Sequence, residues 1–265
     1  MSEYLVDRQG AVMVFTLNRP EVKNALNDTM YFALADALDE ASRDMTVAAV
    51  VVTGAGDAFC SGADTRRMAA KEGVFQGTSA PRTRHSYTYG VQRMSSAFYA
   101  CEVPVIAAVN GAALGLGFDV TTQCDIRIAS ETAIFSEAFV TVGLIPGDGG
   151  FWYLPRIVGY YRAVEMTITG RRLDAATAER WGLVSEVVPA GQALEAALKL
   201  ANDIATKPPQ TVRLSKKLIR EGMETSLQTA LSLGAMAQAV LTGSVDQREA
   251  VAALTERRKA EYQGV

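Results

Sequence analysis

The chain has 265 residues, of which 49% are hydrophobic and 21% charged, and its formal net charge is −3. This balance is typical of a globular protein with a large buried core and excludes a disordered chain. The slight acidity, with no basic stripe interleaved with aromatic residues, argues against nucleic acid as a partner.

The N-terminal segment and the most apolar stretch argue against a membrane role. Residues 1–8 lack the basic and then apolar pattern of a secretory signal, so we expect a cytoplasmic protein. The longest uncharged run, 103–118, contains Pro104, Asn110 and several glycines, which disfavour a membrane-spanning helix. The three cysteines form no CxxC pair, so no metal site is expected.

The first half of the chain alternates strand and helix signals. Short β-branched runs at 12–17 and 48–53 predict strands, and apolar residues at helical spacing between them predict a helix over 28–44. Further strands are expected at 105–109 and 125–129, which together indicate an α/β architecture. The polar, aperiodic segment 71–84 predicts a mobile loop over a pocket.

The last part of the chain carries only helical patterns. After Gly191 these patterns cover 193–206, 210–221, 226–241 and 247–262. Pro208 and Pro209 mark the boundary, because proline rarely continues a helix from the preceding turn. We therefore predict an α/β core over 1–207 and a helical region over 208–265 that covers the site or packs on another subunit.

Two glycine-bearing turns, 59–64 and 110–119, each follow a strand signal and lead into a helical one. If Gly115 precedes a helix, the Leu116 N–H is an unpaired first-turn donor, and Ala63 can offer a matching N–H. Such a pair would stabilise the enolate that forms when a thioester loses an α proton. The alternative is that the glycines only permit tight turns and close packing.

Two aspartates are candidate acids or bases. Asp119 follows Leu116 by three residues and shares its helix face, although an acidic first-turn residue also complements the helix dipole. Asp148 lies in a glycine-rich loop before a helix, where it is either a second catalytic carboxylate or the helix N-cap. Glu137 is interpreted as a structural or rim carboxylate, and His85, at an expected helix start, as non-catalytic.

Five segments together resemble the crotonase (enoyl-CoA hydratase/isomerase) superfamily: 17–27, 59–64, 105–117, 124–129 and 143–147. The resemblance implies a spiral of repeated ββα units with a helical C-terminal region. It also implies homotrimers that pair into hexamers, and a coenzyme A thioester substrate with neither a metal nor a separate cofactor.

The resemblance also assigns roles to residues. The Ala63 and Leu116 N–H groups match the family's two oxyanion donors, and 23–25 and 61–65 match its coenzyme A contacts. The expected substrate-binding residues are Lys23, Ala25, Ser61, Ala63, Asp64, Thr65, Gly115, Leu116 and Phe139.

The chain departs from the family at the position that decides the chemistry. Family hydratases hold water with two glutamates, which here correspond to Asp119 and Phe139. A phenyl ring cannot transfer a proton, so the two-glutamate mechanism does not carry over. In some family isomerases a single aspartate acts from the position of Gly147, one residue before Asp148.

We therefore expect an acyl-CoA enzyme of the hydratase/isomerase type in which Asp119, with Asp148 as the second candidate, moves the proton. One alternative is an enoyl-CoA isomerase with a single-aspartate proton shuttle. The other is a non-catalytic acyl-CoA-binding protein.

Overall fold

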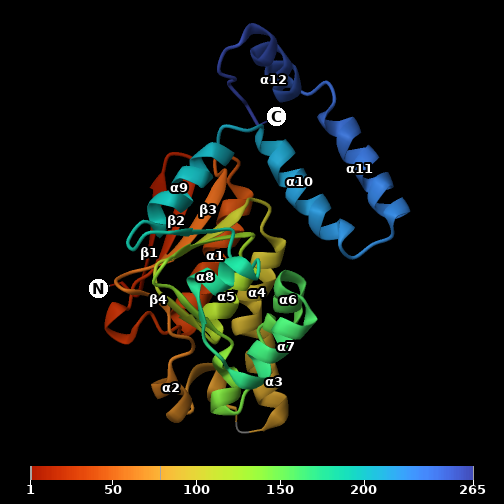
Figure 1. Ribbon diagram of the computed structural model, residues 1–265. Coiled ribbons are helices and arrows are strands. Elements are labelled where there is room, and N and C mark those ends of the chain that lie inside the picture. The colour runs from red at the N-terminus through yellow and green to blue at the C-terminus, as the bar shows by residue number, and fades with distance from the viewer. Residues whose placement is uncertain (1, 78, 265) are drawn as a thin grey trace.

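The computed structural model describes residues 2–77 and 79–264, which form two sheets surrounded by helices (Figure 1). The larger sheet has the order β1-β2-β3-β5-β7-β10, and the smaller one the order β4-β6-β8-β9. The strands of the larger sheet are β1 (Tyr4–Gln9), β2 (Val12–Leu17), β3 (Ala49–Gly54), β5 (Val105–Val109), β7 (Ile126–Ser130) and β10 (Glu186–Val188). Those of the smaller sheet are β4 (Ala58–Cys60), β6 (Ala112–Leu114), β8 (Ile134–Ser136) and β9 (Leu173–Asp174).

Helices follow pairs of strands along the chain. The α-helices of the α/β part are α1 (Asp28–Arg43), α2 (Thr65–Ala69), α3 (Ala80–Tyr89), α4 (Val91–Ala100), α5 (Leu116–Gln123), α6 (Gly150–Val158), α7 (Tyr160–Thr169), α8 (Ala175–Arg180) and α9 (Ala193–Ile204). Short 3-10 helices are η1 (Pro20–Val22), η2 (Gly73–Phe75) and η3 (Ala138–Val142). The units β3-β4-α2, β5-β6-α5 and β7-β8-α6 repeat the same ββα order, so the predicted α/β spiral is confirmed.

The central strands of the larger sheet, β3 and β5, are buried on both faces. They read as continuous apolar runs because α1 and α4 cover one face and α9 covers the other. The fully buried side chains of α9 are Ala193, Ala197 and Ala201, spaced four residues apart. Their small size lets the helix lie close against the strands.

Most predicted elements agree with the structure to within one or two residues. The segment 71–84 is the main exception, because η2 lies within it and α3 begins at Ala80. The loop prediction was wrong there because no side chain of α3 is fully buried, and a helix without a continuous apolar face leaves no apolar periodicity in the sequence. His85 accordingly lies inside α3 and not at its start. Residue 78 of this segment lies outside the described residues.

Three helices extend beyond the α/β part at the C-terminus: α10 (Pro209–Gly222), α11 (Leu227–Leu241) and α12 (Val245–Glu256). Figure 1 shows them projecting away from the sheets, with α11 returning along α10. The predicted last helix was too long, because Arg257 adopts a left-handed conformation with φ 56° and ends α12. The division at residues 207 and 208 stays a prediction.

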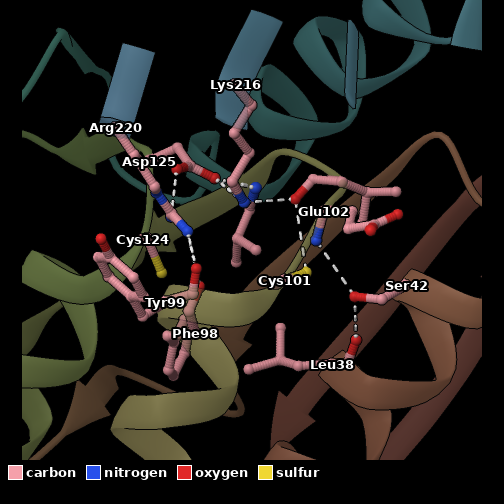
Figure 2. A network of polar contacts seen from close by, with 12 residues as sticks. Leu38, Ser42, Phe98, Tyr99, Cys101, Glu102, Cys124, Asp125, Lys216 and Arg220 are labelled. Atoms are coloured by element: carbon pink, nitrogen blue, oxygen red, sulfur yellow. Dashed lines mark hydrogen bonds and ion pairs between the residues drawn. The ribbon is translucent and has the colours of Figure 1, made fainter. Parts of the chain in front are cut away.

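Cationic side chains attach α10 to the α/β part (Figure 2). Lys216 and Arg220 each lie 2.7 Å from a different carboxylate oxygen of Asp125. Arg220 also donates to the Phe98 and Tyr99 carbonyls at the end of α4. Arg213, one turn earlier and buried, donates to main-chain carbonyls at the end of α1. Cations at these helix C-termini complement the negative ends of the helix dipoles.

Across residues 2–77 and 79–264, no helix combines the length and apolar character needed to cross a bilayer.

Candidate active site

The two glycine-bearing turns meet because β4 and β6 are parallel neighbours, which brings the segments after them to the same sheet edge. Gly62, with φ 107°, packs so closely that a Cβ there would lie 2.9 Å from the Leu114 carbonyl oxygen and 3.7 Å from the Leu116 nitrogen. A Cβ on Gly117 would lie 2.4 Å from the Cys60 carbonyl oxygen. Both glycines are therefore required by close backbone approach.

The backbone around Ala63 leaves its N–H free. A parallel bridge joins Ala63 to Leu26, in which the Leu26 N–H donates to the Gly62 carbonyl at 2.8 Å. The Asp64 N–H donates to the Leu26 carbonyl at 3.0 Å. The bridge thus uses the groups on either side, and the Ala63 N–H has no acceptor among the described residues.

The second N–H belongs to the start of α5, as predicted. Gly115 is the N-cap, with φ 50°, and its own N–H donates to the Ser136 carbonyl at 2.8 Å. Leu116 is the first helical residue, so its N–H has no intrahelical acceptor, and it finds no other acceptor in the described part of the chain. Ala63 and Leu116 line one cavity of about 300 Å³. Free N–H groups at a helix start favour an anionic oxygen.

The other predicted site residues divide into two groups. The cavity is lined by Ser61, Ala63, Asp64, Thr65, Gly115, Leu116, Phe139 and Asp148. Lys23, Ala25 and Asp119 do not line it. Lys23 is exposed and forms an ion pair with Asp57 at 2.6 Å, but its carbonyl accepts from the Ser61 N–H at 2.9 Å, which places it beside the first turn.

Behind the cavity, three carboxyl groups gather around Gly150. Asp119 and Glu137 are fully buried and Asp148 is 2% exposed. A Cβ on Gly150 would lie 2.3 Å from Asp119 Oδ1 and 2.5 Å from Glu137 Oε1, so only glycine fits between them. Of the three, only Asp148 reaches the cavity wall. Asp119, which the sequence predicts to move the proton, is buried behind the cavity and does not line it.

No cation compensates these carboxyl groups. Within the described residues, no arginine, lysine or histidine forms a hydrogen bond or ion pair with a side chain of the cluster. Burial, followed by the negative charges of Asp148 and Glu137, raises the pKa of Asp119 well above its ordinary value. Burial likewise raises the pKa of Glu137 to about 8 and that of Asp148 to about 6. Asp148 therefore ionises first as the pH rises.

The loop that carries Asp148 is anchored from two helices. The Asp148 carbonyl accepts hydrogen bonds from the Ser95 hydroxyl of α4 and, at 3.1 Å, from the Gln123 amide of α5. Gly149, with φ 119°, is the N-cap of α6, and no side chain caps that helix. The N-cap alternative for Asp148 is therefore wrong, and its carboxyl group is free to face the cavity.

Sequence reasoning missed two groups beside Asp148. Glu137 was interpreted as a structural or rim residue, but no part of it is exposed. The signal was its position after β8, which pairs in parallel with β6 and so ends at the same edge as the second turn. Tyr87 of α3 also lines the cavity, and burial together with the Asp148 charge raises its pKa. Its role was missed because α3 gave no periodic apolar pattern in the sequence.

The cavity is also lined by an ion pair whose two charges compensate each other. Arg67 of α2 lies 3.2 Å from a carboxylate oxygen of Asp28, and the Tyr31 hydroxyl donates to the other oxygen at 2.5 Å. Because these charges satisfy each other, Arg67 is not a free cation for a charged acyl group.

Comparisons with known proteins agree with this architecture. The model of the enoyl-CoA hydratase/isomerase family matches residues 7–265. The 2,3-dehydroadipyl-CoA hydratase of Escherichia coli K12 is 34% identical over 264 residues, and the 1,2-epoxyphenylacetyl-CoA isomerase of the same organism is 36% identical over 269; each match covers 100% of both chains. The crystal structure of an enoyl-CoA hydratase from Bacillus anthracis superposes with a TM-score of 0.92 at 34% identity, again covering 100% of both chains.

The resemblance noted in the sequence is thus confirmed over nearly the whole chain, together with the fold that it implies. A matching family model and relatives above 30% identity over full length leave one assignment: the chain is an enzyme of the enoyl-CoA hydratase/isomerase family.

Proposed function

We propose that this enzyme moves a proton next to the carbonyl group of an acyl-CoA thioester, with Asp148 as its acid–base group. The Ala63 and Leu116 N–H groups hold the thioester oxygen. The observation that carries the proposal is that both free N–H groups and the one accessible carboxyl group of the buried cluster line the same cavity. Coenzyme A belongs to the substrate, and no separate cofactor takes part.

The favoured reaction is a 1,3 proton shift in an enoyl thioester. The Asp148 carboxylate takes a proton from carbon 2, the C–H electron pair forms the enolate double bond, and the carbonyl π pair moves to the oxygen. The two N–H groups stabilise that oxyanion, each contributing about 3 kcal/mol by analogy with known oxyanion holes. Asp148 then returns the same proton to carbon 4: the oxyanion re-forms the carbonyl, the enolate pair becomes the C2=C3 double bond, and the C3=C4 π pair of the 3-enoyl substrate takes the proton, so that no atom is gained or lost.

Hydration is the second candidate, since several relatives are named hydratases. Water addition needs a group that orients the water besides the one that moves its proton. Phe139 occupies the position where the sequence comparison expects the second carboxylate. Tyr87 lines the cavity close enough to Asp148 for the Asp148 charge to raise its pKa. Its hydroxyl is therefore the group that could orient the water in place of a second carboxylate.

Turnover of crotonyl-CoA and of a 3-enoyl-CoA tests the proposal, with products identified by mass and by deuterium exchange at the α carbon. An isomerised product without added water is expected, and a hydrated product would instead establish the second candidate. Asp148→Asn should lower kcat by about 10²–10⁴-fold, whereas the control Asp203→Asn, on an exposed helix face, should not. Absence of both turnover and exchange would contradict the proposal and favour a binding protein.

We also propose that the C-terminal helices pack on other copies of the chain, in a homotrimer or homohexamer. These helices expose large apolar side chains, which isolated surface helices rarely do: Ile219, Met223, Leu227, Leu231, Met236, Val240 and Leu254. Among residues 173–264, none lines the cavity of its own chain, so any covering of a site by these helices would act on a neighbouring copy. Light scattering tests the assembly, and a monomer would contradict it. A cytoplasmic location stays a prediction.

A further inference from the structure

Glu137 is a buried acid for which the proposed proton shift has no direct use. It does not line the cavity, and its carboxylate oxygens have no hydrogen-bond donor among the described residues. Burying an isolated carboxylate costs several kcal/mol, so such a group is retained only where it is neutral or serves a neighbour.

The arrangement of the three acids indicates which neighbour it serves. Asp119 lies within hydrogen-bonding reach of both Glu137 and Asp148 and so stands between them. Both oxygens of Asp119, both of Glu137 and one of Asp148 lack a donor from any other described residue. Ionised carboxylates cannot donate to each other. Among the groups that the structure describes, only protons carried by the cluster itself can satisfy these oxygens.

Building on the proposed function, we propose that Glu137 and Asp119 form a protonated, hydrogen-bonded pair that leaves Asp148 as the one charged carboxylate of the cluster. Within this cluster, the protonated Glu137 carboxyl group donates a hydrogen bond to Asp119, and the protonated Asp119 carboxyl group donates one to Asp148. Glu137 is then a positioning residue, since it acts on the substrate only through Asp119 and Asp148.

The surroundings explain why the charge resides on Asp148. It alone borders the cavity, where water or substrate can solvate it, and it immediately precedes the N-terminus of α6. Asp119 and Glu137 are sealed from solvent. Negative charges within hydrogen-bonding reach of one another repel strongly in a buried site. The cluster therefore holds a single negative charge near neutral pH.

The other ionisable groups near the cavity do not change this balance. Tyr87 faces Asp148 from α3 and stays neutral because its pKa is raised. Arg67 is paired with Asp28 and Asp64 with Arg19, whereas Glu72 and Arg172 are exposed. A second ionisation within the cluster would disfavour the enolate, whose negative charge develops in the same cavity.

Infrared spectroscopy of the whole protein tests the pair without any substrate. The wild type should show a protonated-carboxyl carbonyl band at pH 7 that loses part of its intensity as the pH rises through about 8, where Glu137 ionises. Glu137→Gln should remove part of that band. The matched control Glu186→Gln, on the exposed part of β10, should leave the band unchanged. A wild type without the band at pH 7, or with the same band in Glu137→Gln, overturns the proposal.

The pH profile of kcat/KM adds the readout that a merely structural role would not move. The wild type should rise as Asp148 ionises and fall when Glu137 ionises, whereas Glu137→Gln, which donates at every pH, should lose the alkaline fall. An unchanged alkaline fall overturns the positioning role. If Glu137→Gln does not fold, the wild-type band at pH 7 and its partial loss as the pH rises still test the protonated pair. A wild type with the band but without turnover would contradict only the proposed function.

Discussion

The two halves of the site differ in what builds them. The oxyanion half consists of backbone N–H groups at Ala63 and Leu116, placed by glycines that permit two turns to touch. The proton-transfer half consists of side chains at Asp119, Glu137 and Asp148, drawn from three places in the chain and set by burial. Backbone donors survive a change of side chain, so the first half is robust to substitution except at its glycines. The second half is sensitive to every charge near it.

Among the glycine substitutions, the largest expected effect comes from filling the close contact between the two turns. Gly117→Ala places a Cβ 2.4 Å from the Cys60 carbonyl oxygen, which must push α5 and the Leu116 N–H out of position. Loss of one oxyanion donor corresponds to about 10²–10³-fold in kcat. Steady-state kinetics checks this, with Gly234→Ala on α11, where a Cβ meets open space, as the control. Equal activity of both variants would mean that the contact of the turns is dispensable.

A somewhat smaller effect is expected in the carboxyl half from Gly150→Ala. The new Cβ would lie against Asp119 Oδ1 and Glu137 Oε1 and would separate them. Overpacking of this kind costs about 1–3 kcal/mol of stability, and we expect activity to fall about tenfold or more as Asp148 loses its neighbours. Chemical denaturation and kinetics measure the two losses. A fully active Gly150→Ala enzyme would show that the cluster tolerates rearrangement.

The pH dependence of stability isolates the charges of the carboxyl half. The folded-state pKa values of Glu137 and Asp148 are raised to about 8 and about 6, so between the unfolded values near 4 and these values the folded state binds more protons. The free energy of unfolding should therefore fall as the pH rises from about 5 to 8. The slope contributed by each proton is at most about 1.4 kcal/mol per pH unit. Denaturant titrations should show a flatter profile for Asp119→Asn, and parallel profiles would contradict the assignment.

The smallest effect is expected beside the oxyanion half, at its rim. Lys23→Ala removes an ion pair with Asp57 that is exposed to solvent, so little change in stability is expected. If residues 23–25 contact coenzyme A, as the resemblance implies, KM for the thioester should rise about tenfold or less while kcat is kept. Asp57→Ala, which breaks the same ion pair but keeps the lysine, is the matched control. An unchanged KM in Lys23→Ala would remove this contact.

Much of the α/β part could be predicted because its signals are local. The strands β2 and β5 have the predicted bounds, since β-branched runs between turns need no knowledge of their partners. The helix start at Leu116 follows from Gly115 alone. By contrast, α3 could not be predicted, because a helix without a fully buried side chain has no periodic apolar face. The polar residues before Pro81 therefore predicted a loop.

The sequence by itself determined the two glycine turns, the α/β class with its helical C-terminal region, and the family to which the chain belongs. Only the tertiary structure decided that Asp119 lies behind the cavity, that Asp148 faces it and that Glu137 joins them. The physical reason is that a glycine's backbone freedom belongs to the residue, whereas the protonation and reach of a carboxyl group depend on what buries it. Those surroundings come from segments that meet only after the chain has folded.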